Sequence, residues 1–91
     1  MNTDAIFPRL LPQLAEALGL APEACLPQAR LTSDLGAESI DLVDLTFRIE
    51  KTFGITIPEG QLFEDTARRG HDLTVEEVAA FIAARLEARP H

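Results

Sequence analysis

The sequence predicts an all-α fold, a small four-helix bundle with a long loop between its first and second helices. Apolar residues recur at three- and four-residue spacing, the period of an amphipathic helix, in three long stretches: residues 4–18, 39–53 and 74–86. The alternating run Ile55-Thr56-Ile57 is too short to form a sheet without a visible pairing partner. At 91 residues, the chain fits one domain spanning residues 1–91.

The first helix is predicted over residues 4–18. Its apolar stripe includes Leu10 and Leu14, and Gly19 stands where a helix commonly ends. Pro12 falls in the helix interior, where a proline costs about 3 kcal/mol. We therefore expect Pro12 to kink this helix or to move its start to a later residue.

A long connection is predicted between residues 20 and 38. Prolines interrupt it, and residues 22–25 are expected to form a short helical turn. A loop of this length is uncommon in a compact domain unless it is held down. Four leucines are expected to pin it across the helices: Leu20, Leu26, Leu31 and Leu35.

The second helix, residues 39–53, has the strongest pattern in the chain. Ser39 is expected at its N-cap, and Gly54 follows its end. Val43 and Phe47 share one face, which we interpret as a core face. A separate polar stripe follows the same spacing: Asp41, Asp44 and Arg48. Ile55 and Ile57 are then expected to be buried in a connecting loop.

A short helix is predicted over residues 59–65, with Leu62 and Phe63 as its buried pair. The last helix opens at Thr74, and Thr74 with Glu77 has the spacing of a capping box.

The charge and composition exclude several classes of function. A net charge of −7 argues against a nucleic-acid partner and favours basic protein surfaces. Cys25 has no second cysteine to pair with, which suits a reducing compartment. No secretory signal and no apolar run of about 20 residues is visible, so we expect a cytoplasmic protein without membrane insertion.

Two motifs resemble one family. The run Asp34-Leu35-Gly36-Ala37-Glu38-Ser39-Ile40-Asp41 resembles the phosphopantetheine attachment motif of acyl carrier proteins, and Phe53-Gly54-Ile55-Thr56-Ile57-Pro58 resembles the segment that ends their second helix. The two motifs stand at the family's spacing, and the resemblance extends from about residue 4 to residue 86.

The resemblance implies that Ser39 carries 4′-phosphopantetheine, attached by a phosphopantetheinyl transferase that uses coenzyme A. The protein would then be a carrier and not an enzyme. It would hold an acyl group as a thioester for fatty-acid, polyketide or lipid biosynthetic enzymes with basic docking surfaces. The resemblance implies a set of partner-recognition residues: Glu38, Ile40, Asp41, Val43, Asp44 and Glu50. It also implies residues that line an acyl cavity: Phe47, Ile55, Ile57, Leu62 and Phe63.

The chain departs from the family pattern in three ways. Glu38 stands where the family usually has aspartate before the serine. Arg48 and Lys51 make the second half of the helix less acidic than the family norm. The stretch between Pro58 and Val75 is several residues longer than usual and contains Arg68 and Arg69. These departures point to a specialised carrier with a restricted set of partners.

Alternatives remain for each of these features. Ser39 can be a plain helix cap, and Asp41 and Asp44 a solvated face. A peptidyl or aminoacyl carrier is the close variant, and an unmodified acidic helical interaction module is the rival from another class. An enzyme is discounted because the sequence has neither a nucleophile–base pair nor residues at metal-ligand spacing. We expect a monomer.

Overall fold

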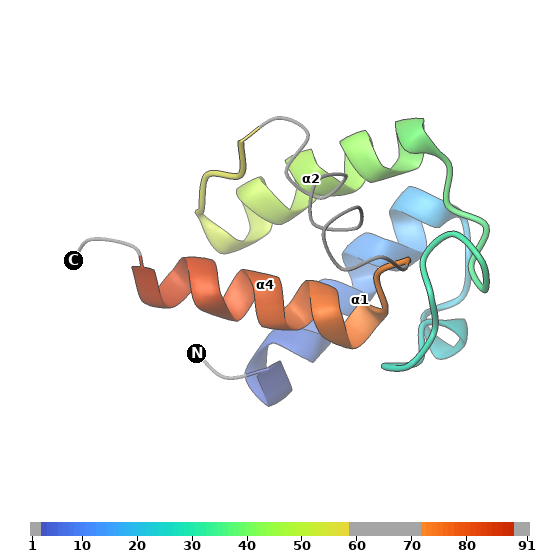
Figure 1. The fold of residues 1–91 in the computed structure, drawn as a ribbon, viewed down its shortest axis with the longest axis horizontal. Coiled ribbons are helices and arrows are strands. Elements are labelled where there is room, and N and C mark those ends of the chain that lie inside the picture. Colours follow the sequence, from blue (N-terminus) through green and yellow to red (C-terminus); the bar gives the residue numbers. More distant parts are fainter. Residues whose placement is uncertain (1–2, 59–71, 89–91) are drawn as a thin grey trace.

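The computed structural model describes residues 3–58 and 72–88, and these residues form three α-helices and a short 3₁₀ turn (Figure 1). In chain order the elements are α1 (Thr3–Leu18), η1 (Pro22–Ala24), α2 (Ser39–Phe53) and α4 (Val75–Ala88). The predicted all-α class is confirmed, and α2 has the predicted bounds. The short helix predicted over residues 59–65, with Leu62 and Phe63, lies outside the described residues.

The core forms where α1 packs against both α2 and α4 (Figure 1). Each helix contributes aliphatic side chains that are fully removed from water: Leu10 and Leu14 of α1, Leu45 and Ile49 of α2, and Val78 and Ile82 of α4. Burying one such side chain stabilises a fold by about 1.5–3 kcal/mol. These buried side chains therefore fix the packing of the three helices. They also determine which face of α2 points to solvent.

Helix α1 is continuous through both of its prolines. It begins at Thr3 and contains Pro8 and Pro12. Of the two expected effects of Pro12, a kink or a later start, the later start was therefore wrong. Both prolines lie on the exposed side, where water can bond the backbone carbonyls that lose their helical donors. The opposite side buries Ile6, Leu10 and Leu14 completely, and this packing offsets the cost of the prolines.

Local signals end the helices where the sequence predicts. Gly19 adopts a φ of 69°, and the N–H of Leu20 reaches back to the carbonyl of Ala15 at 3.0 Å, which is a Schellman ending. Gly54 has a φ of 67° and donates to the carbonyl of Glu50 at 2.9 Å. Both positions favour glycine because a side chain disfavours this left-handed conformation.

The start of α4 is held by the predicted capping box. The N–H of Thr74 donates to Oε1 of Glu77 at 3.0 Å, and the N–H of Glu77 donates to Oγ1 of Thr74 at 3.1 Å. This reciprocal pair satisfies two backbone donors that a helix start would leave unbonded.

The long loop between α1 and α2 is hydrogen-bonded to the start of α4. Leu31 donates to the carbonyl of Leu73 at 2.9 Å, Val75 donates to Ala29 at 3.0 Å, and an isolated antiparallel bridge joins Arg30 to Thr74. Of the four leucines expected to pin the loop, Leu31 is buried, Leu20 and Leu35 are partly buried, and Leu26 is 51% exposed. The prediction for Leu26 was wrong, because its side chain is exposed. The loop is held without it, since backbone hydrogen bonds fix much of this segment.

Helix α2 turns a different apolar stripe to the core than the sequence suggests. Leu45, Ile49 and Phe53 are its buried residues. The predicted core face is exposed instead: Val43 is 44% and Phe47 is 65% exposed, and Ile40, on the same side, is 72% exposed. Both stripes have helical spacing, so periodicity alone does not decide between them. Packing against α1 selects the stripe that contains Leu45 and Ile49.

Candidate functional site

Ser39 is the first residue of α2, and the residue before it, not Ser39 itself, is the N-cap. Glu38 occupies the N-cap, with an extended backbone at φ −102° and ψ 171°, and its carbonyl accepts from Leu42 at 3.1 Å. The N–H of Glu38 donates to Oδ2 of Asp41 at 2.9 Å. The assignment of Ser39 as N-cap was therefore wrong. Its exposed side chain is not required for that role, and it lies at the positive end of the helix dipole.

A tightly bonded turn delivers the chain to Ser39. The carboxylate of Asp34 accepts from the N–H of Arg30 at 2.8 Å, and Ala37 donates to the carbonyl of Leu31 at 2.8 Å. Gly36 has a φ of 74°, which gives the turn its left-handed step. The run from Asp34 to Ala37 is therefore held by local hydrogen bonds to residues 30–32.

Asp72 fastens this turn to the segment before α4. Its Oδ2 atom accepts three hydrogen bonds: from the N–H of Thr32 at 3.0 Å, the N–H of Ser33 at 2.7 Å and the hydroxyl of Ser33 at 3.0 Å. Asp72 is not predictable from the sequence, because no local motif marks a carboxylate whose partners lie about 40 residues away in the chain.

An open hollow of about 480 Å³ lies beside Ser39. Its apolar lining comes from the loop, from α2 and from the segment before α4: Leu31, Ala37, Leu42 and Leu73. Thr32, Glu38 and Asp72 supply its polar part. A group attached to Ser39 would thus meet an apolar surface with a polar edge directly beside its point of attachment.

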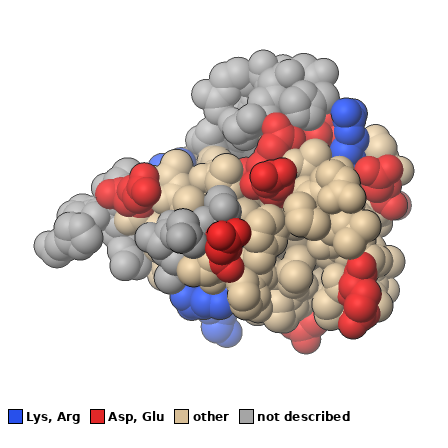
Figure 2. All heavy atoms as spheres, turned by 90° about the horizontal axis from the view of Figure 1, so that it is seen from below, with Lys and Arg blue, Asp and Glu red and all other residues tan. Residues whose placement is uncertain are grey.

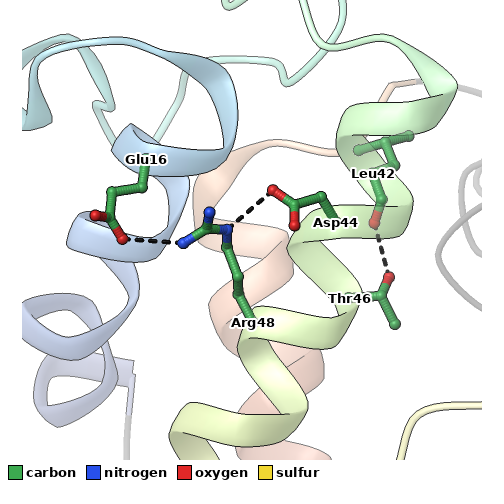
Figure 3. A network of polar contacts seen from close by, with 5 residues as sticks. All are labelled: Glu16, Leu42, Asp44, Thr46 and Arg48. Atoms are coloured by element: carbon green, nitrogen blue, oxygen red, sulfur yellow. Dashed lines mark hydrogen bonds and ion pairs between the residues drawn. The ribbon is translucent and has the colours of Figure 1, made fainter.

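Asp44 and Asp41, two of the predicted recognition acids, have different partners. Asp44 is paired with Arg48 at 2.9 Å, and Arg48 also pairs with Glu16 of α1 at 2.9 Å (Figure 3). The hydrogen bond to Asp44 is the main cause that raises the pKa of the Arg48 guanidinium. Asp41 bonds the N-cap backbone, as described above. The charge of Asp44 is therefore already compensated within the molecule, whereas that of Asp41 is not matched by an ion pair among the described residues.

Glu50 is hydrogen-bonded to the segment that follows α2. Its Oε2 atom accepts a hydrogen bond from the N–H of Ile57 at 2.9 Å, and the side chain is partly buried. Glu50 therefore has a structural role beside the recognition role that the resemblance implies. Glu50 braces the segment that follows α2, and this brace holds Ile57 in the core.

The exposed side of α2 combines apolar and charged residues. Ile40, Val43 and Phe47 form an exposed apolar face along about two turns. Glu38 and Asp44 are exposed near its start, and Lys51 is exposed near its end. Acidic residues also lie apart from one another on the face viewed in Figure 2, which is seen from below in the orientation of Figure 1. The negative charge of the protein is thus not confined to α2.

The residues expected to line a cavity separate into two groups. Ile55 is 7% and Ile57 is 4% exposed, so both are buried as predicted. Phe47 is 65% exposed and belongs to the apolar face, so its placement inside a cavity was wrong.

Cys25 is a buried thiol. It is 3% exposed, so it packs as a small apolar core residue, and burial raises its pKa.

Within residues 3–58 and 72–88, no group of three or more His, Cys, Asp or Glu side chains is placed to hold a metal ion. None of the helices in this part of the chain is both long and apolar enough to cross a membrane.

The comparisons with known proteins point to one family. Residues 8–67 match the family model described as a phosphopantetheine attachment site. The acyl carrier protein of Saccharopolyspora erythraea is 36% identical over 92 residues, covering 99% of this chain and 96% of that protein. The acyl carrier protein of Bdellovibrio bacteriovorus is 32% identical, covering 92% and 99%. That of Thermosynechococcus vestitus is also 32% identical, covering 97% and 100%.

Proposed function

The chain belongs to the acyl carrier protein family, whose members are carriers and not catalysts, and we propose that Ser39 is its attachment point for 4′-phosphopantetheine. The observation that carries this proposal is the position of Ser39. It is exposed at the first residue of α2, within the matched residues and directly after the Asp34–Glu38 run.

The residues around Ser39 fit a phosphorylated group. The first backbone N–H groups of a helix lack intrahelical partners, and the helix dipole favours a negative charge there. Glu38 holds the cap without using the serine hydroxyl, because Asp41 bonds the Glu38 N–H. The hollow of about 480 Å³ then offers apolar surface to whatever extends from the phosphate. The prosthetic group supplies a thiol that holds the acyl chain as a thioester.

The residues of α2 would recognise the phosphopantetheinyl transferase and the acyl-handling enzymes. Glu38 and Asp41 offer negative charge to a basic docking surface, and Ile40, Val43 and Phe47 offer apolar contact. Exposed ion pairs are individually worth about 0–1 kcal/mol, so such docking is transient and sensitive to salt. Transient docking suits a carrier, since it must leave one enzyme before it meets the next.

The acyl chain would shelter in the interior next to the attachment point. The apolar lining of the hollow beside Ser39 is the nearest surface for it, and Ile55 and Ile57 are buried within the same fold. Leu62 and Phe63 stay in the proposal as residues outside the described part of the chain. A bound acyl chain stabilises the folded state because only that state offers this surface.

The remaining parts of the proposal concern the protein as a whole. We take residues 1–91 as one domain that acts as a monomer in the cytoplasm. The buried, reduced Cys25 suits a reducing compartment, in which a thiol-bearing arm also stays reduced. An acyl carrier is favoured over a peptidyl carrier because Ala37 and Glu38 precede the serine, where peptidyl carriers generally have a second glycine and often a histidine.

The attachment is tested by intact mass after incubation with coenzyme A and a broad-specificity phosphopantetheinyl transferase. The wild-type chain should gain one phosphopantetheine group, and Ser39→Ala should gain none. Ser33→Ala is the matched control, because Ser33 is the other serine of the chain and lies in the same turn region. Absence of a gain with several transferases would contradict the carrier proposal and support an unmodified interaction module.

The shelter is tested by the melting temperature of the modified chain loaded with acyl groups of increasing length. The melting temperature should rise with acyl length for as long as the interior accepts the chain. A melting temperature that is the same for every length would contradict the shelter and leave the attachment untouched.

A further inference from the structure

A second hollow lies at the other end of α2 from Ser39, between α2 and α1. Its volume is about 470 Å³, and its lining is Gln13 of α1 with Phe47, Arg48, Lys51 and Thr52 of α2. Lys51 follows Phe47 by one helical turn, so the hollow continues the exposed apolar face. The two features form one surface that runs along most of α2.

The charged residues that line this hollow are the cations Arg48 and Lys51, whereas the start of α2 is acidic. Arg48 is compensated by Asp44 and by Glu16, each at 2.9 Å. Lys51 is exposed and forms no ion pair with any residue of the described ranges. Lys51 is therefore the cation of the hollow that is left to meet an incoming group.

The other lining groups suit a carboxylate with an apolar neighbour. The amide of Gln13 and the hydroxyl of Thr52 can donate hydrogen bonds, and the Lys51 ammonium carries three donors. Phe47 forms an apolar wall that is 65% exposed. An acidic side chain on a protein surface brings both parts together, since its carboxylate faces Lys51 while the surrounding surface covers Phe47.

We propose that the docking surface of this carrier reverses its charge along α2, and that a partner enzyme places an Asp or Glu side chain in the Lys51 hollow. The inference rests on the proposed function, because it describes how a carrier of this kind meets its enzyme. Basic groups of the partner face Glu38 and Asp41, its apolar residues cover Val43 and Phe47, and its acid meets Lys51.

The dimensions allow one enzyme to make all of these contacts. From Ser39 to Lys51 the helix rises about 18 Å, at about 1.5 Å per residue. A standard interface buries about 800 Å² on each partner, enough to cover a strip of this length. The charge order also discriminates between enzymes, since a uniformly basic docking surface would set a cation against Lys51, and like charges in an interface disfavour the wrong partner.

The test measures kcat/KM for acyl transfer with the modified protein and a panel of purified condensing, acyl-transferring and ketoreducing enzymes. For the panel enzyme with the highest wild-type kcat/KM, Lys51→Glu should lower that value about tenfold at low salt, and the loss should shrink in 1 M salt. The matched control is Arg85→Glu, which makes the same charge change on α4. It should change kcat/KM less than about twofold.

A reversal on the enzyme completes the test. Replacing the enzyme's contacting Asp or Glu with Lys should restore transfer with Lys51→Glu and weaken transfer with the wild type. Equal losses in Lys51→Glu and Arg85→Glu, or faster transfer with Lys51→Glu, would overturn the charge reversal. Both variants should still gain the phosphopantetheine group and keep the helical circular dichroism signal. A wild-type chain that is not modified, or that no panel enzyme accepts, contradicts the proposed function instead.

Discussion

One carboxylate oxygen of Asp72 accepts hydrogen bonds from both the backbone N–H and the hydroxyl of Ser33, at 2.7 and 3.0 Å. A third bond, from the N–H of Thr32, reaches the same oxygen at 3.0 Å. These contacts join the turn that leads to Ser39 with the segment that starts α4. The turn before Ser39 is therefore held by a residue far from it in the sequence.

Removing this carboxylate should loosen the turn. Asp72→Ala deprives three donors of their acceptor, and we expect a loss of about 1.5–3 kcal/mol in the free energy of unfolding, because hydrogen bonds to charged groups have this magnitude. Urea denaturation measures the loss. The rate of Ser39 modification should fall as well, because the transferase then meets a less ordered turn.

Two variants serve as controls for Asp72. Asp72→Asn keeps one acceptor oxygen and should lose less stability than Asp72→Ala. Glu76→Ala removes an exposed acid from the first turn of α4 and should change stability by less than about 0.5 kcal/mol. If Asp72→Ala and Glu76→Ala were equally stable, the role given to Asp72 would be wrong.

Glu50 should behave as a brace and not as a docking residue. Glu50→Ala removes the acceptor of the Ile57 N–H and should lower the free energy of unfolding by about 1–2 kcal/mol, while Glu50→Gln keeps an acceptor and should lower it less. Under conditions in which both variants are fully folded, they should transfer acyl groups at the wild-type rate. A slower transfer by Glu50→Gln, with stability unchanged, would return Glu50 to the recognition residues.

The sequence predicts the helix boundaries well because local residues determine them. Gly19 and Gly54 end their helices through their own backbone conformation, and the Thr74–Glu77 capping box closes within one turn. Each of these signals involves residues that are at most a few positions apart. The bounds of α2 and the all-α class follow from such signals together with the apolar period.

Features that depend on distant residues are not predictable in this way. The outer face of α2 and its core face share one period, so only packing against α1 shows that Phe47 is exposed and Ile49 is buried. The contacts of Asp72 span about 40 residues. Serine is a preferred N-cap residue, but the extended backbone of Glu38 takes the position here. The place of Ser39 at the start of α2 follows from the local pattern, whereas the contacts that support the turn before it do not.

Asp41 and Asp44 should differ as docking residues despite their similar positions on α2. Asp44→Asn removes a charge that Arg48 already compensates, so we expect acyl transfer to slow less than about twofold. Asp41→Asn removes a charge without an ion-pair partner in the described residues and keeps an oxygen that can accept from the Glu38 N–H. It should therefore slow transfer more, with the difference between the two variants greatest at low salt.

The comparison of these two variants uses kcat/KM with an acyl-handling enzyme at two salt concentrations. Melting temperatures measured in parallel show whether either substitution disturbs the start of α2. Equal effects of Asp41→Asn and Asp44→Asn at low salt would mean that Arg48 does not shield Asp44 during docking.

The thiol of Cys25 should be much less reactive than the thiol of an attached arm. Cys25 is 3% exposed, and its pKa is raised above the ordinary value by burial. A raised pKa leaves less thiolate at any given pH, and the thiolate is the reactive form. At pH 8 an aromatic disulfide reagent should therefore react slowly with the unmodified chain and rapidly with one thiol of the modified chain.

Urea should make Cys25 of the unmodified chain react rapidly, because unfolding removes the burial that shields the thiol and raises its pKa. The modified Cys25→Ala variant is the control, and it should keep the rapid phase with the same amplitude. A rapid phase of equal amplitude in the folded, unmodified wild type would show that Cys25 is accessible. Thiol titration then distinguishes the thiol of the attached arm from that of Cys25, since in the folded protein we expect only the arm to expose a thiolate to solvent.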